Sequence, residues 1–209
     1  MPRKDYLSQE ALHMFYHPPV LNSEQRLLFL QIPAWATEYL KTLQTPTTKV
    51  GFLLQVGYFR MVSRFYVPNR FHQNDVDFLA ERISVDSNDV DMNEYAKATV
   101  LRHQKEILEH FGFNPFDDSA IEVLLSEAER LAHIQTRPDL IFEGMISFLQ
   151  DHHIEIPAYN TLRTILEKAL NNFESNLESI LTRHLTPEDT ALLNQLLVEH
   201  SSYQDNSKK

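Results

Sequence analysis

Four polar residues stand in front of an almost wholly apolar stretch, TPTTKVGFLLQVGYFR, and their types suit contact with an anion. Thr45, Thr47 and Thr48 bring hydroxyl groups, and Lys49 brings a positive charge. At the start of a helix such side chains lie beside backbone N–H groups that have no partner within the helix, and this end attracts phosphate. One interpretation is therefore contact with nucleic acid. The other is a helix cap at Thr45 followed by a solvated lysine.

Three further groups of side chains have the same character. Asparagine and arginine can read the edges of bases through paired hydrogen bonds, tyrosine commonly reaches phosphate, and arginine and lysine neutralise the DNA backbone. For each group the alternative is an ordinary helical hairpin or the solvated face of an amphipathic helix. The groups are Arg60 with Arg64, then Arg102 and Lys105 with Lys97 and His103, and finally Tyr159, Asn160 and Arg163.

The sequence offers little for catalysis or metal binding. His103, Glu106 and His110 share one helical face and could hold a metal only with a ligand from elsewhere, so a charged surface face is the simpler interpretation. No phosphate-binding loop, dinucleotide-binding glycine motif or serine-hydrolase elbow occurs. Without cysteine there is no disulfide, thiolate metal site or cysteine nucleophile. We expect a protein that is not an enzyme and that holds no metal or cofactor.

Charge is distributed unevenly along the chain. The net charge is −10, yet residues 1–70 contain eight basic and four acidic side chains. Residues 71–100 contain two basic and seven acidic side chains, and residues 101–209 contain nine and eighteen. The basic excess thus coincides with the first candidate group. An acidic protein can bind DNA through a local basic face, but weakly and with strong dependence on salt.

The elements that must position these side chains are helical. Four glycines in 209 residues are too few for a protein of sheets and hairpins, and prolines separate segments of 3.6-residue periodicity. We expect an all-α fold, an orthogonal helical bundle with tandem helix-turn-helix-like modules. The expected helices span residues 7–15, 22–30, 34–43, 47–66, 73–84, 93–111, 118–135, 138–151, 158–182 and 187–198.

Two pairs of these helices have the proportions of a helix-turn-helix, in which the start of the second helix enters a DNA groove. They are 34–43 with 47–66 and 138–151 with 158–182. The turn-forming stretch GFNPFDDS predicts a boundary between a first module at 1–115 and a second at 116–200, followed by a disordered tail at 201–209.

The start of the sequence and its hydropathy bear on location. The first ten residues, MPRKDYLSQE, contain no apolar leader, and no apolar run approaches the ~20 residues of a membrane span. The absence of cysteine fits an intracellular protein. We therefore expect a cytoplasmic protein without membrane contact.

Long stretches of the chain resemble the N-terminal region of Tn-three family transposases, which move DNA by replicative, cointegrate-forming transposition. The resemblance covers about residues 7–185. It is carried by LSQEALHMFYHPPVLNSEQRLLFLQIP, TPTTKVGFLLQVGYFRMVSRFYVPNRFHQNDVDFLAERI, RHQKEILEHFGFNPFD and HHIEIPAYNTL. The joined phrases around Gly51 and around Gly112 are long and unusual, which makes the resemblance specific.

The resemblance implies a helical region that recognises the terminal inverted repeats of a transposon in double-stranded DNA. It also implies that the catalytic domain, with its acidic triad and magnesium, lies far downstream, and none of the acids here matches that triad. A second hypothesis is a truncated remnant that acts only through protein contact. Such a remnant would form a homodimer or bind full-length transposase through residues 158–198, and the net charge of −10 favours it.

Overall fold

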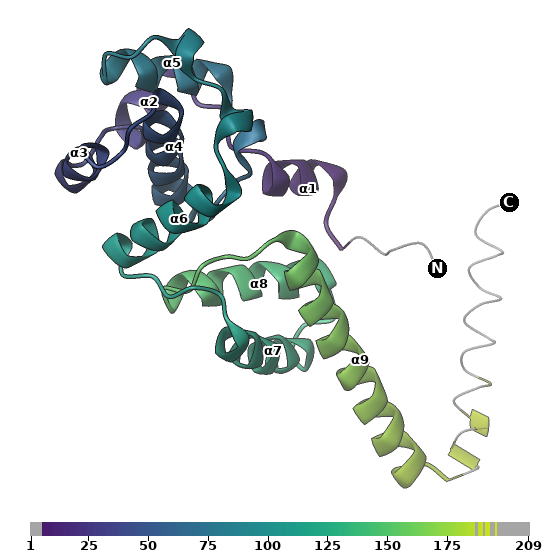
Figure 1. The fold of residues 1–209 in the computed structure, drawn as a ribbon. Coiled ribbons are helices and arrows are strands. Elements are labelled where there is room, and N and C mark those ends of the chain that lie inside the picture. The colour runs from purple at the N-terminus through teal and green to yellow at the C-terminus, as the bar shows by residue number, and fades with distance from the viewer. Residues whose placement is uncertain (1–5, 187, 190, 193–194, 196–209) are drawn as a thin grey trace, which may run out of the picture.

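The computed structural model describes residues 6–186, 188–189, 191–192 and 195, and this part of the chain is helical (Figure 1). The expected all-α bundle is confirmed. Among the described residues there is no strand, and an isolated bridge joins Asn114 to Ile154. The helix expected over 187–198 lies largely outside the described residues. The α-helices are α1 (Gln9–Tyr16), α2 (Ser23–Phe29), α3 (Ala34–Leu40), α4 (Pro46–Val62), α5 (Gln73–Arg82), α6 (Lys97–Phe111), α7 (Asp118–Ala132), α8 (Pro138–Asp151) and α9 (Tyr159–His184), with 3₁₀ turns η1 (Pro68–Arg70), η2 (Ser87–Asp89) and η3 (Met92–Glu94).

Local signals in the sequence set several helix ends. The side chain of Asn22 accepts from the N–H of Gln25, whose own side chain accepts from the Asn22 N–H, which makes a capping box. Gly112 ends α6 in the left-handed conformation at φ 67°, where a residue without Cβ is favoured. The helix expected over 47–66 ends earlier, at Val62, because Ser63 turns the chain at φ 52°.

Helix α4 lies at the centre of the first hydrophobic cluster. Eleven of its seventeen residues are buried, and α2, α5 and α6 pack around it. The same cluster holds a buried carboxylate, since Asp75 accepts from Arg26 at 2.6 Å and from the Tyr58 hydroxyl at 2.7 Å. Burial and this carboxylate raise the pKa of Tyr58. Helix α4 is therefore a core helix, so a helix-turn-helix role would rest on its first turn.

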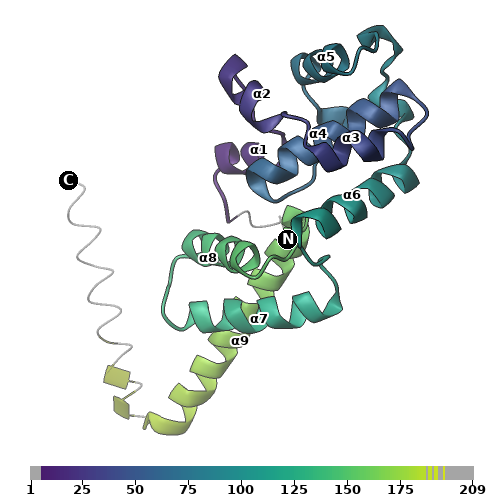
Figure 2. The same cartoon turned by 90° about the vertical axis from the view of Figure 1, so that its left-hand side faces the viewer.

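Helices α7, α8 and α9 form the second hydrophobic cluster, which α1 joins from the other end of the chain (Figures 1 and 2). The ring of Phe15 lies 5.9 Å from the rings of both Phe142 and Tyr159, and Leu12 is buried beside it. The expected first module, 1–115, includes α1. In the structure the aromatic side chains of α1 pack instead against α8 and α9, which belong to the expected second module.

The segment after α4 ties α1 to the first cluster. Arg64 donates to the carbonyl of Met14 at 3.2 Å, and Arg70 donates to the carbonyl of Tyr16 at 3.0 Å. The guanidinium of Arg64 also lies 3.9 Å from the centre of the Phe15 ring. Helix α1 thus contacts both clusters and holds them side by side.

Candidate nucleic-acid interface

The outer face of α6 presents exposed cations. Lys97, Arg102 and Lys105 are exposed, while Val100, His103 and Ile107 are buried against the first cluster. Lys97 and Lys105 are eight residues apart, and Leu101 lies between them with 55% of its surface exposed, so the three share one side of the helix. The amphipathic period that buries one face of α6 therefore exposes a short basic strip on the other.

Arg102 lies beside Tyr39 of α3, and the carboxylate of Glu106 is also near this tyrosine. Arg102 interacts with the Tyr39 hydroxyl. Burial, followed by the charge of Glu106, raises the pKa of Tyr39 above its ordinary value, and Arg102 partly offsets this. A phosphate at this point would meet one guanidinium with a carboxylate nearby. Within the α6 group, Arg102 and Lys105 are exposed, as the sequence analysis expects of a surface contact, whereas His103 is buried.

The tip of α4 is less open than its sequence indicates. The Thr45 side chain accepts from the Thr48 N–H at 3.2 Å, and the Thr48 hydroxyl donates to the Thr45 carbonyl at 2.9 Å. Thr47 is buried, and its hydroxyl accepts from the N–H of Asp91 at 3.1 Å. Lys49 is half-buried. Thr47 is thus corrected from a nucleic-acid contact to an internal contact, because an acidic loop packs over this end of the helix.

Arg60, in the last turn of α4, and Arg64, just after the helix, are used inside the molecule. Arg60 donates to the carbonyls of Leu28 and Phe29, the latter at 3.0 Å, so it covers the open end of α2. Arg64 donates to Met14 and, at 2.7 Å, to the Tyr66 hydroxyl. Neither is placed as a phosphate contact on an open surface, because each satisfies carbonyls at the end of a neighbouring helix.

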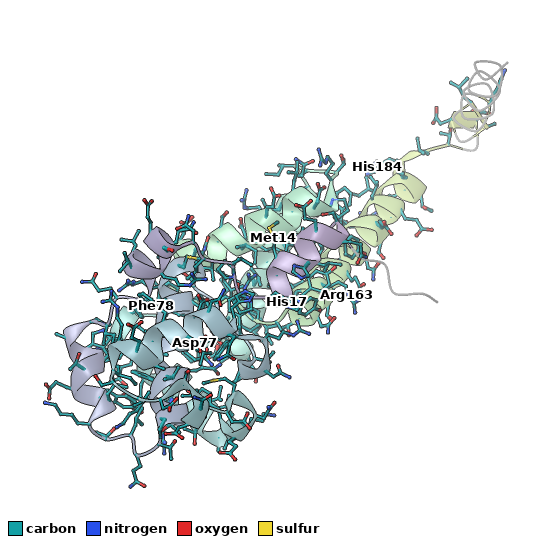
Figure 3. All side chains as sticks on the ribbon, turned by 90° about the horizontal axis from the view of Figure 1, so that it is seen from above. Met14, His17, Asp77, Phe78, Arg163 and His184 are labelled. Atoms are coloured by element: carbon teal, nitrogen blue, oxygen red, sulfur yellow. The ribbon has the colours of Figure 1, made fainter. Side chains whose placement is uncertain are left out.

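The start of α9 exposes one of its three candidates. Asn160 is exposed, whereas Tyr159 and Arg163 are 2% and 7% exposed. The Tyr159 hydroxyl accepts from the Tyr6 N–H at 3.3 Å, and Arg163 lies 3.6 Å from the Glu167 carboxylate. Figure 3 shows Arg163 where α9 meets the N-terminal segment. Tyr159 and Arg163 are therefore corrected from DNA contacts to core residues that α1 covers.

Sequence reasoning missed Arg70, an exposed cation in η1 that lies next to the end of α1. The available signal was the run RFYVPNRF, in which basic and aromatic residues alternate over a short distance. The histidine face of α6 does not assemble, because His103 is buried and His110 stacks on Trp35 with ring centres 3.9 Å apart. Among the described residues, no group of three or more His, Asp or Glu side chains is placed to hold a metal ion.

Comparison with known protein families adds an independent finding. Residues 6–169 match the family described as "Domain of unknown function (DUF4158)". The chain belongs to this family. The matched range begins before α1 and ends within α9, so it takes in both hydrophobic clusters. The DUF4158 domain is thus the whole packed body and excludes the outer half of α9.

The DUF4158 chain is also similar to a curated protein, the transposase for transposon Tn1546 of Enterococcus faecium. The two are 22% identical over 201 residues, which cover 90% of this chain. The same alignment covers 20% of the transposase, so the chain spans about a fifth of that relative's length. No helix in the described part of the chain is both long and apolar enough to cross a membrane.

Proposed function

We propose that this DUF4158 domain is a non-catalytic DNA-binding region of a transposase and that it recognises the terminal inverted repeats of a transposon. The observation that carries the proposal is the similarity to the Tn1546 transposase along nine-tenths of the chain. That similarity covers a fifth of the transposase, which is compatible with a part that supplies binding and no chemistry.

The basic strip of α6 supports the DNA part of the proposal. Lys105 and Arg102 are exposed on a helix whose other face is fixed in the core, so their positions are set before a ligand arrives. We assign phosphate contact to these two residues and to the half-buried Lys49. Exposed Asn160, whose amide can pair with adenine in the major groove, is the candidate for reading bases, with Thr45 and Thr48 beside Lys49.

Fluorescence anisotropy with two labelled duplexes tests this assignment. A duplex carrying the terminal repeat of the transposon that encodes the chain should bind more tightly than a scrambled duplex at the same salt concentration. Lys105→Ala should weaken binding of both duplexes alike, by a few-fold, because phosphate contacts carry no sequence information. Asn160→Ala should reduce the difference in affinity between the two duplexes. Asn171 is an exposed asparagine further along α9, and Asn171→Ala should leave that difference unchanged. Equal affinity of the wild-type chain for both duplexes would remove the claim of recognition.

A second candidate function is contact with another transposase chain. The outer half of α9 extends away from α7 and α8 (Figure 1) and exposes Leu177, Ile180 and Leu181 by 42–49% of their surface. These residues continue the apolar stripe that is buried earlier in the helix, and the net charge of −10 disfavours DNA. Light scattering separates the candidates, since a stable dimer without DNA affinity supports protein contact and a DNA-binding monomer supports the first proposal.

A further inference from the structure

A cavity of about 590 Å³ opens between the two hydrophobic clusters. Its walls come from the end of α1, the segment 64–70, the first half of α6 and residues 155–159 at the start of α9. The volume lies within the range of about 300–1,000 Å³ that is usual for sites of small organic ligands. It is therefore large enough for one nucleotide.

The walls are mainly aromatic and apolar. Four aromatic residues from three places line the cavity: Tyr16 from α1, Phe65 and Tyr66 from the segment after α4, and Tyr95 from the loop before α6. Aromatic rings that line a cavity are the usual platform for nucleobases, because every base offers a flat π-face whatever its sequence. An aliphatic side chain would also be accommodated by such walls, so the charges at the rim must decide between the two.

Cations dominate that rim. Arg64, Arg70 and Lys97 line the cavity, and Glu155 is the acid that lines it among the described residues. Burial raises the pKa of Glu155, which reduces its tendency to carry a negative charge. Three cations around one opening stand out in a chain whose net charge is −10. This excess of positive charge fits an anionic occupant better than an apolar peptide.

Arg64 has a donor that the protein itself leaves unused. Its terminal nitrogen is bonded to Met14 and Tyr66, and its guanidinium packs on the Phe15 ring, so its position is fixed. The Nε–H group is buried and has no hydrogen-bond partner among the described residues. A buried donor left without a partner is destabilising. Because this atom is closed to solvent, what Arg64 offers an occupant of the cavity is its fixed positive charge.

Two helices also begin at this cavity. The first residues of α6 and α9 line it, and the N-cap positions of these helices are Ala96 and Ala158, which provide no side-chain cap. At many helix starts a serine, threonine or aspartate side chain accepts a hydrogen bond from one of the first N–H groups. Here no side chain does so, and these N–H groups keep their partial positive charge. This feature reinforces the cationic rim and would not suffice without it.

We propose that this cavity receives one unpaired nucleotide of a DNA strand, with the base among the aromatic rings and the phosphate at Arg70 and Lys97. The proposal rests on the proposed function, because DNA binding brings the strand to the domain. It goes beyond that function by assigning a site for a base that has left the duplex. Taking a nucleotide out of its base stack costs a few kcal/mol. Stacking of the base on aromatic side chains of the protein offsets part of this cost.

Two probes test the proposal with the full chain. One is a 20-base-pair duplex that contains a single unpaired 2-aminopurine, and the other is the same duplex without the extra nucleotide. The unpaired probe should bind roughly five- to a hundredfold more tightly, as one added stacking contact allows. Its 2-aminopurine emission should fall on binding, because the base stacks on aromatic side chains. Equal affinities together with unchanged emission would overturn the proposal.

Variants connect the effect to the cavity. Ala158→Trp places a large ring in the cavity from an exposed, extended position, at φ −60° and ψ 147°, so it should abolish the preference for the unpaired probe. Ala158→Trp should lower the affinity for the unpaired probe more than the affinity for the fully paired duplex, because Ala158 lines the cavity and is not an assigned duplex contact. Should Ala158→Trp fail to fold, Lys97→Glu should likewise lower the affinity for the unpaired probe more than that for the paired duplex. Lys168→Glu is its matched control, with an equal charge change at an exposed site of α9 outside the cavity, and it should keep the preference.

Failure of the proposed function can be told apart from failure of the cavity. If the chain binds neither duplex but still lowers the emission of the free 2-aminopurine deoxynucleotide monophosphate, with Ala158→Trp abolishing that change, the cavity proposal stands and DNA recognition falls. If a hydrophobic dye fills the cavity of the wild-type chain and the nucleotide does not displace it, the occupant is an apolar protein segment. That result would overturn the proposal.

Discussion

His103 is fully buried in the first cluster, where its ring lies against Phe52 and its Nδ1 is hydrogen-bonded with the Tyr95 hydroxyl. Its Nε2 is buried and has no hydrogen-bond partner among the described residues. Burial and then the charge of Arg102 lower the pKa of this imidazole from 6.5 to about 4. The neutral His103 ring thus packs the inner face of α6 against the first cluster, and its burial disfavours protonation of the ring.

We predict that His103 makes the fold sensitive to acid. As pH falls from about 6.5 to about 4, the unfolded chain binds a proton at this residue and the folded chain does not, so the free energy of unfolding decreases. The loss should reach roughly 2–3 kcal/mol, since one pKa unit corresponds to about 1.4 kcal/mol. Urea unfolding at pH 7.5 and pH 4.5 measures it. His103→Gln should reduce the pH dependence, while His110→Gln, at an exposed site on the same helix, should retain it.

At the scale of the element, the close approach of α4 to its neighbours depends on two glycines. A Cβ on Gly51 would lie 2.5 Å from the Tyr95 ring, and one on Gly57 would lie 2.3 Å from the Leu30 side chain and 3.2 Å from the Phe29 carbonyl. Tyr95 is buried and bonded to His103, so its ring has little room to move. The sequence phrase around Gly51 and Gly57 is therefore explained by packing inside the first cluster, with no need for a ligand.

We predict that Gly51→Ala destabilises the fold although alanine favours a helix. The overpacking against Tyr95 should cost about 1–3 kcal/mol, which exceeds the gain in helix propensity of about 1 kcal/mol. Gly144→Ala in α8 is the comparison, because its new Cβ would meet only the end of the Leu131 side chain, at 2.8 Å, and that side chain can rotate. It should leave stability unchanged or slightly raised. Thermal unfolding followed by circular dichroism would contradict the prediction if both variants behaved alike.

At the scale of the whole molecule, a helix from the beginning of the chain completes a core formed near its end. Phe15 packs on Phe142 and Tyr159, and Arg64 from the segment after α4 covers its other face. This arrangement makes the second cluster depend on residues more than a hundred positions away. It also places the nucleotide cavity between parts of the chain that the two clusters share.

We predict that Phe15→Ala lowers the free energy of unfolding by about 3–5 kcal/mol, the range for removing a buried phenylalanine. The neighbouring Met14→Ala should change it by less than about 0.5 kcal/mol, because Met14 is 61% exposed. Urea denaturation of the full chain measures both. If the two variants unfold at the same urea concentration, α1 does not support the second cluster as described.

We also predict how salt affects DNA binding by the whole molecule. With Arg60 and Arg64 occupied internally, about three cations remain for phosphate, so the slope of log affinity against log salt should be about −3. Affinity for a duplex should therefore fall roughly 40-fold between 50 and 200 mM salt, and Lys105→Ala should make the slope less steep by about 1. Anisotropy titrations at four salt concentrations measure it. A slope near −6 would mean that the internal arginines also contact DNA.

The sequence by itself determined that the chain is helical and set several of the helix ends. The Thr45 cap, the left-handed Gly112 and the period of apolar residues act within a few positions of the chain, so they can be read without a structure. The module boundary near residue 115 stays a prediction. Of the candidate site, Arg102, Lys105 and Asn160 were predictable as exposed, because each stands opposite the apolar face of its own helix.

Only the tertiary structure decided which other polar side chains face water. A helical period cannot say that the loop before α6 covers Thr47, that α1 covers Tyr159 and Arg163, or that Arg60 and Arg64 satisfy carbonyls of α2 and α1. These contacts join residues from 31 to 153 positions apart, and each is set by how apolar surfaces pack. The physical reason is that burial depends on the partner surface, and the partner lies elsewhere in the chain.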